Sequence, residues 1–291
     1  MTSDETRNVR QTPLHDEHVR LGARMAPFGG WDMPIQYSTG ILAEHRAVRT
    51  ACGIFDVSHM GRLSVRGDRG MEFAQRMFTN DAGQLRTDQA QYSLLLRDDG
   101  GTLDDALVYR LDNHLMLIVN AGNTPTDLDW LRSDLPPGVE LRDDTEATGM
   151  LAVQGPLALE TVQRLTEVPL RRLRYYHCTT GTIDGIPSTI SRTGYTGEDG
   201  VELICPADKV VELWHAILQA GQPDGVTPSG LGARDTLRTE ASMTLYGHEL
   251  TVARTPFEAV LQRYVAMDKG WFHGRDALER QGQAPPQTLV G

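Results

Sequence analysis

Lysine is almost absent from this 291-residue chain, which contains only Lys209 and Lys269. Arginine is therefore nearly the only cation available for binding carboxylates or other anions. Acidic residues outnumber Lys and Arg by 39 to 28, and the formal net charge is -11. A surface of that charge repels phosphate backbones, so we expect no nucleic-acid partner.

Cysteine is also scarce, and the three cysteines at positions 52, 178 and 205 form no CxxC pair. Their spacing argues against a disulfide scaffold and a cysteine zinc site, and it fits a reducing compartment. The nine histidines form no HxH or HExxH motif, so nothing supports a metal site. No apolar run approaches the roughly 18 residues of a membrane span, and the N-terminus lacks a hydrophobic signal core. We therefore expect a cytoplasmic protein without a membrane partner.

The length and the order of elements predict a mixed α+β fold. A chain of 291 residues is long for one compact core, so two packed sub-domains are expected. Hydrophobic periodicity and turn residues predict helices at 41–48, from Pro156 onward, at 210–218 and at 231–241. Strands are expected at 92–96, 103–110, 114–120, 149–154, 178–183, 189–192 and 201–205. Because the strands do not alternate regularly with helices, the pattern indicates antiparallel sheets.

The hairpin over residues 103–120 can be placed in register from its turn. If Asp-Asn at 112–113 is a two-residue turn, counting outward places Asp105 opposite Asn120. A preceding turn at 98–101 then places Tyr92 diagonally next to Asp105 on the same face. The sequence therefore predicts that these three polar side chains share one face of a largely apolar meander.

Two interpretations of Asp104 and Asp105 stay open at this point. In the first, both are solvated residues at the edge of a turn where a strand begins. In the second, Asp105 lies on a covered face and needs a partner or a purpose, because an unpaired buried charge is costly. The expected neighbour Asn120 adds weight to the second interpretation.

A glycine-rich loop at 193–200 and a helix after it supply the other candidate residues. The loop lacks the Lys-Ser/Thr ending of a P-loop, and its glycines alone predict a β-turn with positive φ angles. Glu202 follows just inside the next strand. Arg234 is expected in the first turn of its helix, where the helix dipole disfavours a cation. That placement fits either a binding site or a surface salt bridge.

Seven short motifs stand in a characteristic order along the chain. They are Phe-Gly-Gly-Trp-Asp-Met-Pro-Ile-Gln-Tyr at 28–37, Phe-Asp-Val-Ser-His-Met at 55–60, Gly-Gly-Thr-Leu-Asp-Asp at 100–105, Val-Asn-Ala at 119–121, Ala-Val-Gln-Gly-Pro at 152–156, Gly-Tyr-Thr-Gly-Glu-Asp-Gly-Val-Glu at 194–202 and Gly-Ala-Arg-Asp-Thr-Leu-Arg at 232–238. Over residues 13 to about 278, the chain resembles the tetrahydrofolate-dependent aminomethyltransferase family, the T-protein of the glycine cleavage system and its close relatives.

The resemblance implies two interleaved sub-domains of antiparallel sheets and helices around a central cavity, together forming a folate-binding region over residues 12–285. Sub-domain one is expected at roughly 12–50 plus 145–245, and sub-domain two at roughly 51–144 plus 246–285. The implied reaction moves the one-carbon unit of an aminomethyl group from a lipoylated H-protein to tetrahydrofolate. Ammonia and 5,10-methylenetetrahydrofolate are the products.

The resemblance also assigns roles to individual residues. Asp105 matches the essential acid, and a carboxylate suits a reaction that develops positive charge and moves protons between amines. Glu202 matches a residue that binds the pterin ring. The N–H groups of that ring can donate a pair of hydrogen bonds to one carboxylate. Further folate-binding positions are Tyr92, Asn120, Tyr195 and Arg234.

Two features depart from the family pattern. The family normally continues into a barrel-like C-terminal domain, which is expected to be missing here, with 286–291 as its stub. Leu-Gln-Arg-Tyr at 261–264 stands where the family pattern has a glycine and a tryptophan.

Alternative functions within the same resemblance stay open. One is a folate-dependent demethylase or one-carbon transferase that acts on a different amine, sulfonium or aryl ether. Another is a folate-binding module without turnover. A regulatory relative linked to iron–sulfur assembly is disfavoured, because Lys-Gly-Trp at 269–271 replaces its Lys-Gly-Cys.

Overall fold

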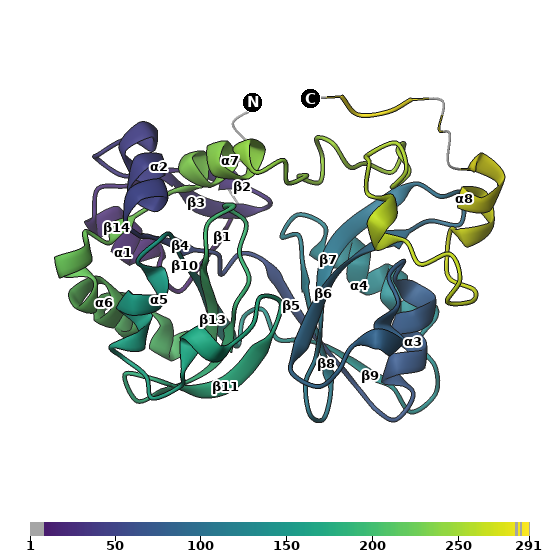
Figure 1. The fold of residues 1–291 in the computed structure, drawn as a ribbon, viewed down its shortest axis with the longest axis horizontal. Helices are drawn as coiled ribbons and strands as arrows, with labels where there is room; N and C mark the ends of the chain where they lie inside the picture. Colours follow the sequence, from purple (N-terminus) through teal and green to yellow (C-terminus); the bar gives the residue numbers. More distant parts are fainter. Residues whose placement is uncertain (1–8, 283–284, 286, 291) are drawn as a thin grey trace. The chain divides into compact units, whose positions relative to one another are not determined.

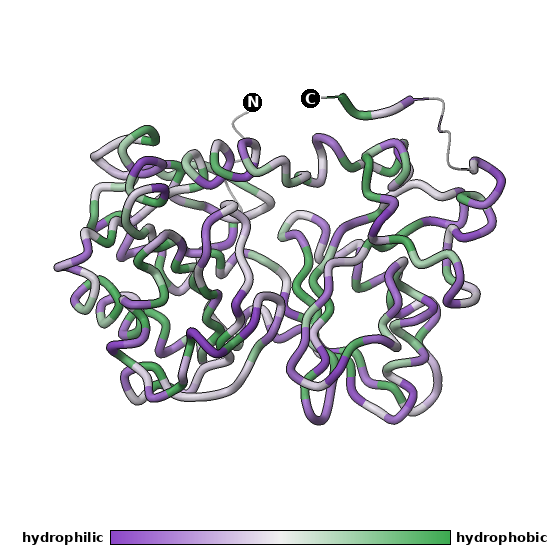
Figure 2. Tube along the Cα trace, in the orientation of Figure 1, coloured by the Kyte–Doolittle hydropathy of each residue, from purple (hydrophilic) through white to green (hydrophobic). Residues whose placement is uncertain are grey.

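The computed structural model describes residues 9–282, 285 and 287–290, and Figure 1 shows its helices and strands. The chain forms two compact units. Unit 1 comprises Met1–Met60 and Thr145–Met243, and unit 2 comprises Gly61–Asp144 and Thr244–Gly291. Each unit is thus built from two stretches that are far apart in the sequence. In Figure 2 hydrophobic residues recur along the strands, whereas many connecting loops are hydrophilic.

Unit 1 contains a six-stranded sheet. Its strands in spatial order are β11 (Cys178–Ile183), β12 (Ile186–Ser191), β13 (Gly200–Pro206), β10 (Thr148–Gln154), β4 (Gly53–Asp56) and β14 (Thr227–Pro228). The ladders are antiparallel except for the short one between β14 and β4. Nearly every residue of β13 and β10 is buried, which is typical of strands covered on both faces.

Helices α5 (Ala158–Gln163) and α6 (Val210–Ala220) pack against this sheet. Leu213, Trp214 and Ile217 of α6 are fully buried in one cluster with residues of β4, β10 and β13. The predicted apolar stripe of this helix is therefore confirmed as its core-facing side. The helix expected to open at Pro156 begins two residues later, at Ala158.

Unit 1 also contains a small three-stranded sheet. Its strands in spatial order are β1 (Arg10–Gln11), β3 (Trp31–Gln36) and β2 (Arg24–Phe28). The accompanying helices are α1 (His15–Arg20), α2 (Ile41–Thr50) and α7 (Leu231–Glu240). The buried Glu44 of α2 accepts hydrogen bonds from the backbone N–H of Tyr37 at 2.6 Å and of Gly230 at 2.9 Å. One carboxylate thereby ties α2 to the end of β3 and to the start of α7.

Unit 2 is built on a five-stranded antiparallel sheet. Its strands in spatial order are β6 (Gln89–Leu96), β7 (Thr102–Arg110), β8 (Leu115–Val119), β5 (Gly61–Arg66) and β9 (Glu140–Asp143). Helices α3 (Gly70–Met77) and α4 (Thr124–Ser133) share a hydrophobic cluster with one face of the sheet. Leu94 and Leu96 of β6 belong to a second cluster, with residues of the segment that follows residue 244 and contains α8 (Arg275–Gln281).

The meander β6–β7–β8 has the predicted register. Leu94 pairs with Asp105, and Ala106 pairs with Val119, so Asp105 lies opposite Asn120. The Leu111 N–H donates to His114 O at 2.9 Å across the turn at 112–113. A period of two residues along each strand therefore directs Asp105 to the face that carries Tyr92.

Other expectations meet the structure with mixed results. The mixed α+β class is confirmed. Several elements have no counterpart among the predicted ones, namely β1, β2, β3, β4, β5, β9, β14, α1, α3, α4 and α8. Residues 286 and 291 of the expected stub lie outside the described residues, and no strand forms over 287–290. Among the described helices, none combines the length and apolar character needed to cross a membrane.

Candidate active site

A cluster of carboxyl and amide side chains lies at the start of β7 in unit 2. Asp104 is fully buried and Asp105 is partly buried. Asn120, just after β8, donates from Nδ2 to Asp104 Oδ1 and to Asp105 Oδ1, both at 2.8 Å. One amide thus binds both neighbouring carboxyl groups.

Tyr92 completes the hydrogen bonding of Asp105. Its hydroxyl donates to Asp105 Oδ2 at 2.9 Å, so each oxygen of this carboxyl receives a donor. Tyr264 packs edge-on against the Tyr92 ring with centroids 4.6 Å apart. The structure therefore brings together the three residues of unit 2 that the sequence placed on one face, and it adds Tyr264 from the segment that departs from the family pattern.

The environment holds Asp105 close to its midpoint of ionisation at neutral pH. Burial and, after it, the neighbouring charge of Asp104 raise the pKa of its carboxyl to about 7, and the hydrogen bonds from Tyr92 and Asn120 act in the opposite direction. A group with a pKa near 7 can both take up and release a proton, as a general acid or base must.

The burial of Asp104 shows that the solvated turn-edge interpretation is wrong for this residue. The backbone N–H of Asn120 donates to Asp104 Oδ2 at 3.0 Å, and Asn123 Nδ2 donates to Oδ1 at 2.9 Å. Asn123 is the N-cap residue of α4, but its side chain does not cap the helix. It is directed to Asp104 instead, although an asparagine at this position usually accepts a hydrogen bond from a backbone N–H of the first turn.

Glu202 lies on β13 in unit 1 and is 6% exposed. Thr193 Oγ1 donates to Glu202 Oε2 at 2.5 Å. Burial raises the pKa of Glu202, while the Thr193 hydrogen bond and the charge of Arg234 lower it. A buried carboxylate with remaining acceptor capacity is suited to bind a ligand that carries N–H donors.

Arg234 lies in α7 with its guanidinium 4.7 Å from the centroid of the Tyr195 ring. Its Nη1 is buried and has no hydrogen-bond partner among the described residues. Burial lowers the pKa of this guanidinium, and the charge of Glu202 opposes the change. Between two residues of this helix, it is Arg238 that forms a salt bridge, with Asp235. An unsatisfied guanidinium N–H is costly to bury, so Arg234 is open to an acceptor from a ligand.

The loop at 193–200 owes its glycines to two different constraints. Gly197 has a φ of +79°, as the turn prediction requires. At Gly194 the reason is space, because a Cβ atom there would lie 1.9 Å from Gln154 Oε1. The prediction of positive φ angles is therefore right for Gly197 and wrong for Gly194.

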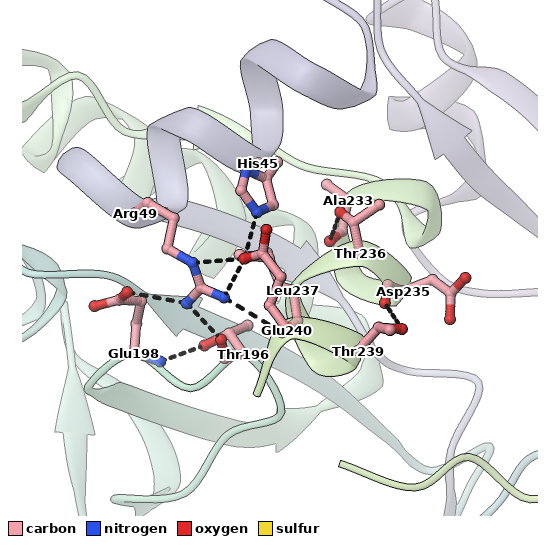
Figure 3. A network of polar contacts seen from close by, with 10 residues as sticks. All are labelled: His45, Arg49, Thr196, Glu198, Ala233, Asp235, Thr236, Leu237, Thr239 and Glu240. Carbon is pink, nitrogen blue, oxygen red and sulfur yellow. Dashed lines mark hydrogen bonds and ion pairs between the residues drawn. The ribbon is translucent and has the colours of Figure 1, made fainter. Parts of the chain in front are cut away.

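Arg49 links this loop to α7, as Figure 3 shows. Its guanidinium donates to Thr196 O at 2.7 Å and to Glu198 Oε1 at 2.9 Å in the loop. It also donates to Glu240 Oε2 at the end of α7, at 2.8 Å, and His45 lies 2.8 Å from the same oxygen. The segments that carry Tyr195 and Arg234 are thereby fixed to α2.

Several site residues were missed by sequence reasoning. Asn123 and Asp127 follow Asn120 at helical spacing across the end of β8, which is the only signal the sequence carried for them. Tyr264 belongs to the segment that was noted only for its departure from the family pattern, and Arg49 belongs to unremarkable sequence. Both depend on tertiary contacts. Among the described residues, no group of His, Cys, Asp and Glu side chains could hold a metal ion.

The fold and both polar clusters can now be compared with known proteins. The solved structure of glycine cleavage system aminomethyltransferase T from Bartonella henselae superposes with a TM-score of 0.87 and 33% identity, over 94% of this chain and 74% of that one. The aminomethyltransferase of Chloroherpeton thalassium is 47% identical over 97% of this chain and 78% of its own length. That of Geobacillus kaustophilus is 48% identical over 97% of this chain and 79% of its own.

These similarities define a class of aminomethyltransferase-like folds. The family described as GCVT N-terminal domain matches residues 14–269, and the chain belongs to this family. The expected family resemblance is therefore confirmed, both in sequence and in fold.

We expect Asp105→Asn to change the free energy of unfolding in a pH-dependent way. The pKa of Asp105 rises from an ordinary 3.8 to about 7 on folding, which corresponds to about 4 kcal/mol. Its proton therefore contributes stability that is fully present below about pH 4 and is lost as the pH rises through about 7. Relative to the variant, the parent should lose stability over this window in urea unfolding. Asp112→Asn, in the exposed turn of the same hairpin, is the matched control, and a pH-independent difference for Asp105→Asn would contradict the raised pKa.

Replacing Arg49 with Met should loosen the loop at 193–200 without unfolding unit 1. The change removes charged hydrogen bonds to Thr196 O and Glu198, each of which stabilises by about 1.5–3 kcal/mol. We expect the backbone amides of this loop to exchange at least about tenfold faster, measured by hydrogen-exchange mass spectrometry. Arg46→Met, on an exposed position of the same helix, should leave the loop unchanged. Equal exchange in both variants would show that the loop does not depend on Arg49.

Proposed function

We propose that this chain transfers the one-carbon unit of an aminomethyl group, carried by a lipoylated H-protein, to tetrahydrofolate. Ammonia and 5,10-methylenetetrahydrofolate are the products. The observation that carries the proposal is the Asp105 carboxyl, held by Tyr92 and Asn120 with a pKa raised to about 7. The names of its relatives support the same reaction, because they are aminomethyltransferases.

Asp105 is proposed to move the protons of the reaction. Release of ammonia from an aminomethyl group requires protonation of the leaving nitrogen, and attack by an amine nitrogen requires that a proton be removed. A carboxyl with a pKa near 7 is present in both forms at neutral pH. In its ionised form, it also stabilises the positive charge that develops on the transferred carbon.

Glu202, Arg234 and Tyr195 of unit 1 are proposed to hold tetrahydrofolate. The side chains fit such a group, because the buried Glu202 can accept hydrogen bonds from the N–H groups of a pterin. The buried Nη1 of Arg234 lacks an acceptor among the described residues, which a carbonyl or carboxylate could supply. When bound, tetrahydrofolate would supply the nitrogen nucleophiles that accept the one-carbon unit.

The partner and the location follow from the same proposal. A lipoylated H-protein is the proposed donor, and the glycine cleavage system is the proposed context. The net charge of -11 argues against a nucleic-acid partner. We also propose a cytoplasmic location, which the three free, buried cysteines support.

Asp105→Asn should abolish transfer while leaving tetrahydrofolate binding largely intact. The substitution preserves shape and removes the group that moves protons, so the rate should fall at least about a hundredfold. We would measure turnover with aminomethylated H-protein, and affinity by calorimetric titration with reduced tetrahydrofolate. Asp112→Asn is the control, with the same chemical change in an exposed turn. Turnover of Asp105→Asn within a few-fold of the parent, or turnover of the parent with free methylated amines alone, would contradict the proposal.

Glu202→Ala should weaken tetrahydrofolate binding at least about tenfold, because hydrogen bonds to a charged acceptor are lost. The dissociation constant from calorimetry is the measurement. Glu212→Ala removes an exposed glutamate of α6 and should leave the affinity unchanged. If Glu202→Ala binds as tightly as the parent in a folded chain, Glu202 does not bind the pterin.

A further inference from the structure

Asp127 is a buried acid next to the cluster at the start of β7. It lies in the first turn of α4 and is fully buried. No donor among the described residues reaches either of its carboxyl oxygens, and its side chain lies within hydrogen-bonding reach of the Asp104 carboxyl. Its backbone N–H donates to Asn123 O at 2.9 Å, so it lies one helical turn after the residue that binds Asp104. An ionised carboxylate at this position would lack both water and donors, which is costly.

The groups that face Asp127 make ionisation still less favourable. Asp104 and Asp105 face it from β7, while Tyr246 faces the cluster from the segment after residue 244. None of these groups is a cation, and both carboxyl groups repel a further negative charge. Burial, followed by the charge of Asp104, raises the pKa of Asp127 to about 11.

We propose that Asp127 is a positioning residue for Asp105: its protonated carboxyl donates a hydrogen bond to Asp104, which in turn holds the Asn120 amide on Asp105. The inference rests on the proposed function, because it names the residue that sets the protonation state of Asp105, the acid of the proposed reaction. Asp127 is not a catalytic residue in this proposal, since it acts only through Asp104.

The contacts of Asp104 show how this works. Oδ1 accepts from Asn120 Nδ2 at 2.8 Å and from Asn123 Nδ2 at 2.9 Å, and Oδ2 accepts from the backbone N–H of Asn120 at 3.0 Å. A further donor from Asp127 gives this buried carboxylate four hydrogen bonds. Burial raises the pKa of Asp104, and this set of hydrogen bonds opposes the rise by stabilising the charged form.

The charged Asp104 then acts on Asp105 in two ways. It orients the Asn120 amide, so that the second amide hydrogen reaches Asp105 Oδ1 at 2.8 Å. Its negative charge also raises the pKa of Asp105 toward neutrality. Amide hydrogens do not pass on a proton, so the proton of Asp127 stays in place and does not reach Asp105 through Asn120.

Two substitutions at position 127 distinguish the role of the hydrogen bond to Asp104 from the role of the acidic group itself. An asparagine amide can donate to Asp104 as the protonated carboxyl does, so Asp127→Asn should leave the titration of Asp105 unchanged. Leucine has a similar size and no donor. In Asp127→Leu, Asp104 should take up a proton and lose its charge, and the pKa of Asp105 should fall because the repulsion is gone.

The test is a carboxyl titration of the whole chain by NMR, with ¹³C-labelled aspartate and without folate or donor. Loss of one resonance in Asp105→Asn and of another in Asp127→Asn assigns the two groups. We expect the Asp127 resonance to stay at its protonated position from about pH 5 to about pH 9. The midpoint of Asp105 should move by less than about 0.3 pH units in Asp127→Asn and fall by about one unit or more in Asp127→Leu.

Asp129→Asn is the matched control, because Asp129 lies on the same helix with an 85% exposed side chain. It should leave the Asp105 midpoint unchanged. An Asp127 that ionises below pH 7 in the parent chain would overturn the proposal, whether or not the variants fold. Equal shifts of Asp105 in the Asn and Leu variants would overturn it as well. Because the titration needs neither folate nor H-protein, its outcome is independent of whether the chain performs the proposed transfer.

Discussion

The candidate site of unit 2 depends on the burial of neighbouring carboxyl groups that no cation in the described part of the chain neutralises. Asp104 and Asp105 follow one another at the start of β7, and the donors that replace water are the amides of Asn120 and Asn123 and the hydroxyl of Tyr92. Neutral donors stabilise a carboxylate less than a salt bridge does, so one group retains a proton near neutral pH. A lysine or arginine in the same place would make Asp105 a permanently charged residue.

The hydrogen bonds around Asp105 require a fixed register between β7 and β8. Side chains alternate between the faces of a sheet, so a slip of one residue between β7 and β8 would separate Asp105 from Asn120. The sheet resists a slip because both faces are covered near the site. Helices α3 and α4 cover one face, and residues that include Leu250 and Phe272 cover the side chains of Leu94 and Leu96 on the other.

In unit 1, helix α2 holds the segments that carry the candidate binding residues. Glu44 and Arg49 both belong to α2, and they bind the two ends of α7 at Gly230 and Glu240. Arg49 also holds the loop that carries Tyr195 (Figure 3). Because α7 is fixed at both ends, it cannot shift to give the buried Arg234 nitrogen a hydrogen-bond partner. That nitrogen therefore stays without a partner among the described residues.

The sequence by itself determined the family, the α+β class and the register that unites Tyr92, Asp105 and Asn120, because a two-residue turn and a period of two residues are local properties. It also placed Glu202 and Arg234 within recognisable motifs. Only the tertiary structure decided that Asp104 is buried, that the N-cap side chain of Asn123 is directed to Asp104, and that the buried Asp127 lies next to Asp104. These features depend on the packing of α4 and β7 in one hydrophobic cluster, and the charge of Asp104 in turn raises the pKa of Asp105. Burial and electrostatic repulsion arise between groups that are distant in the chain, so no local pattern could reveal them.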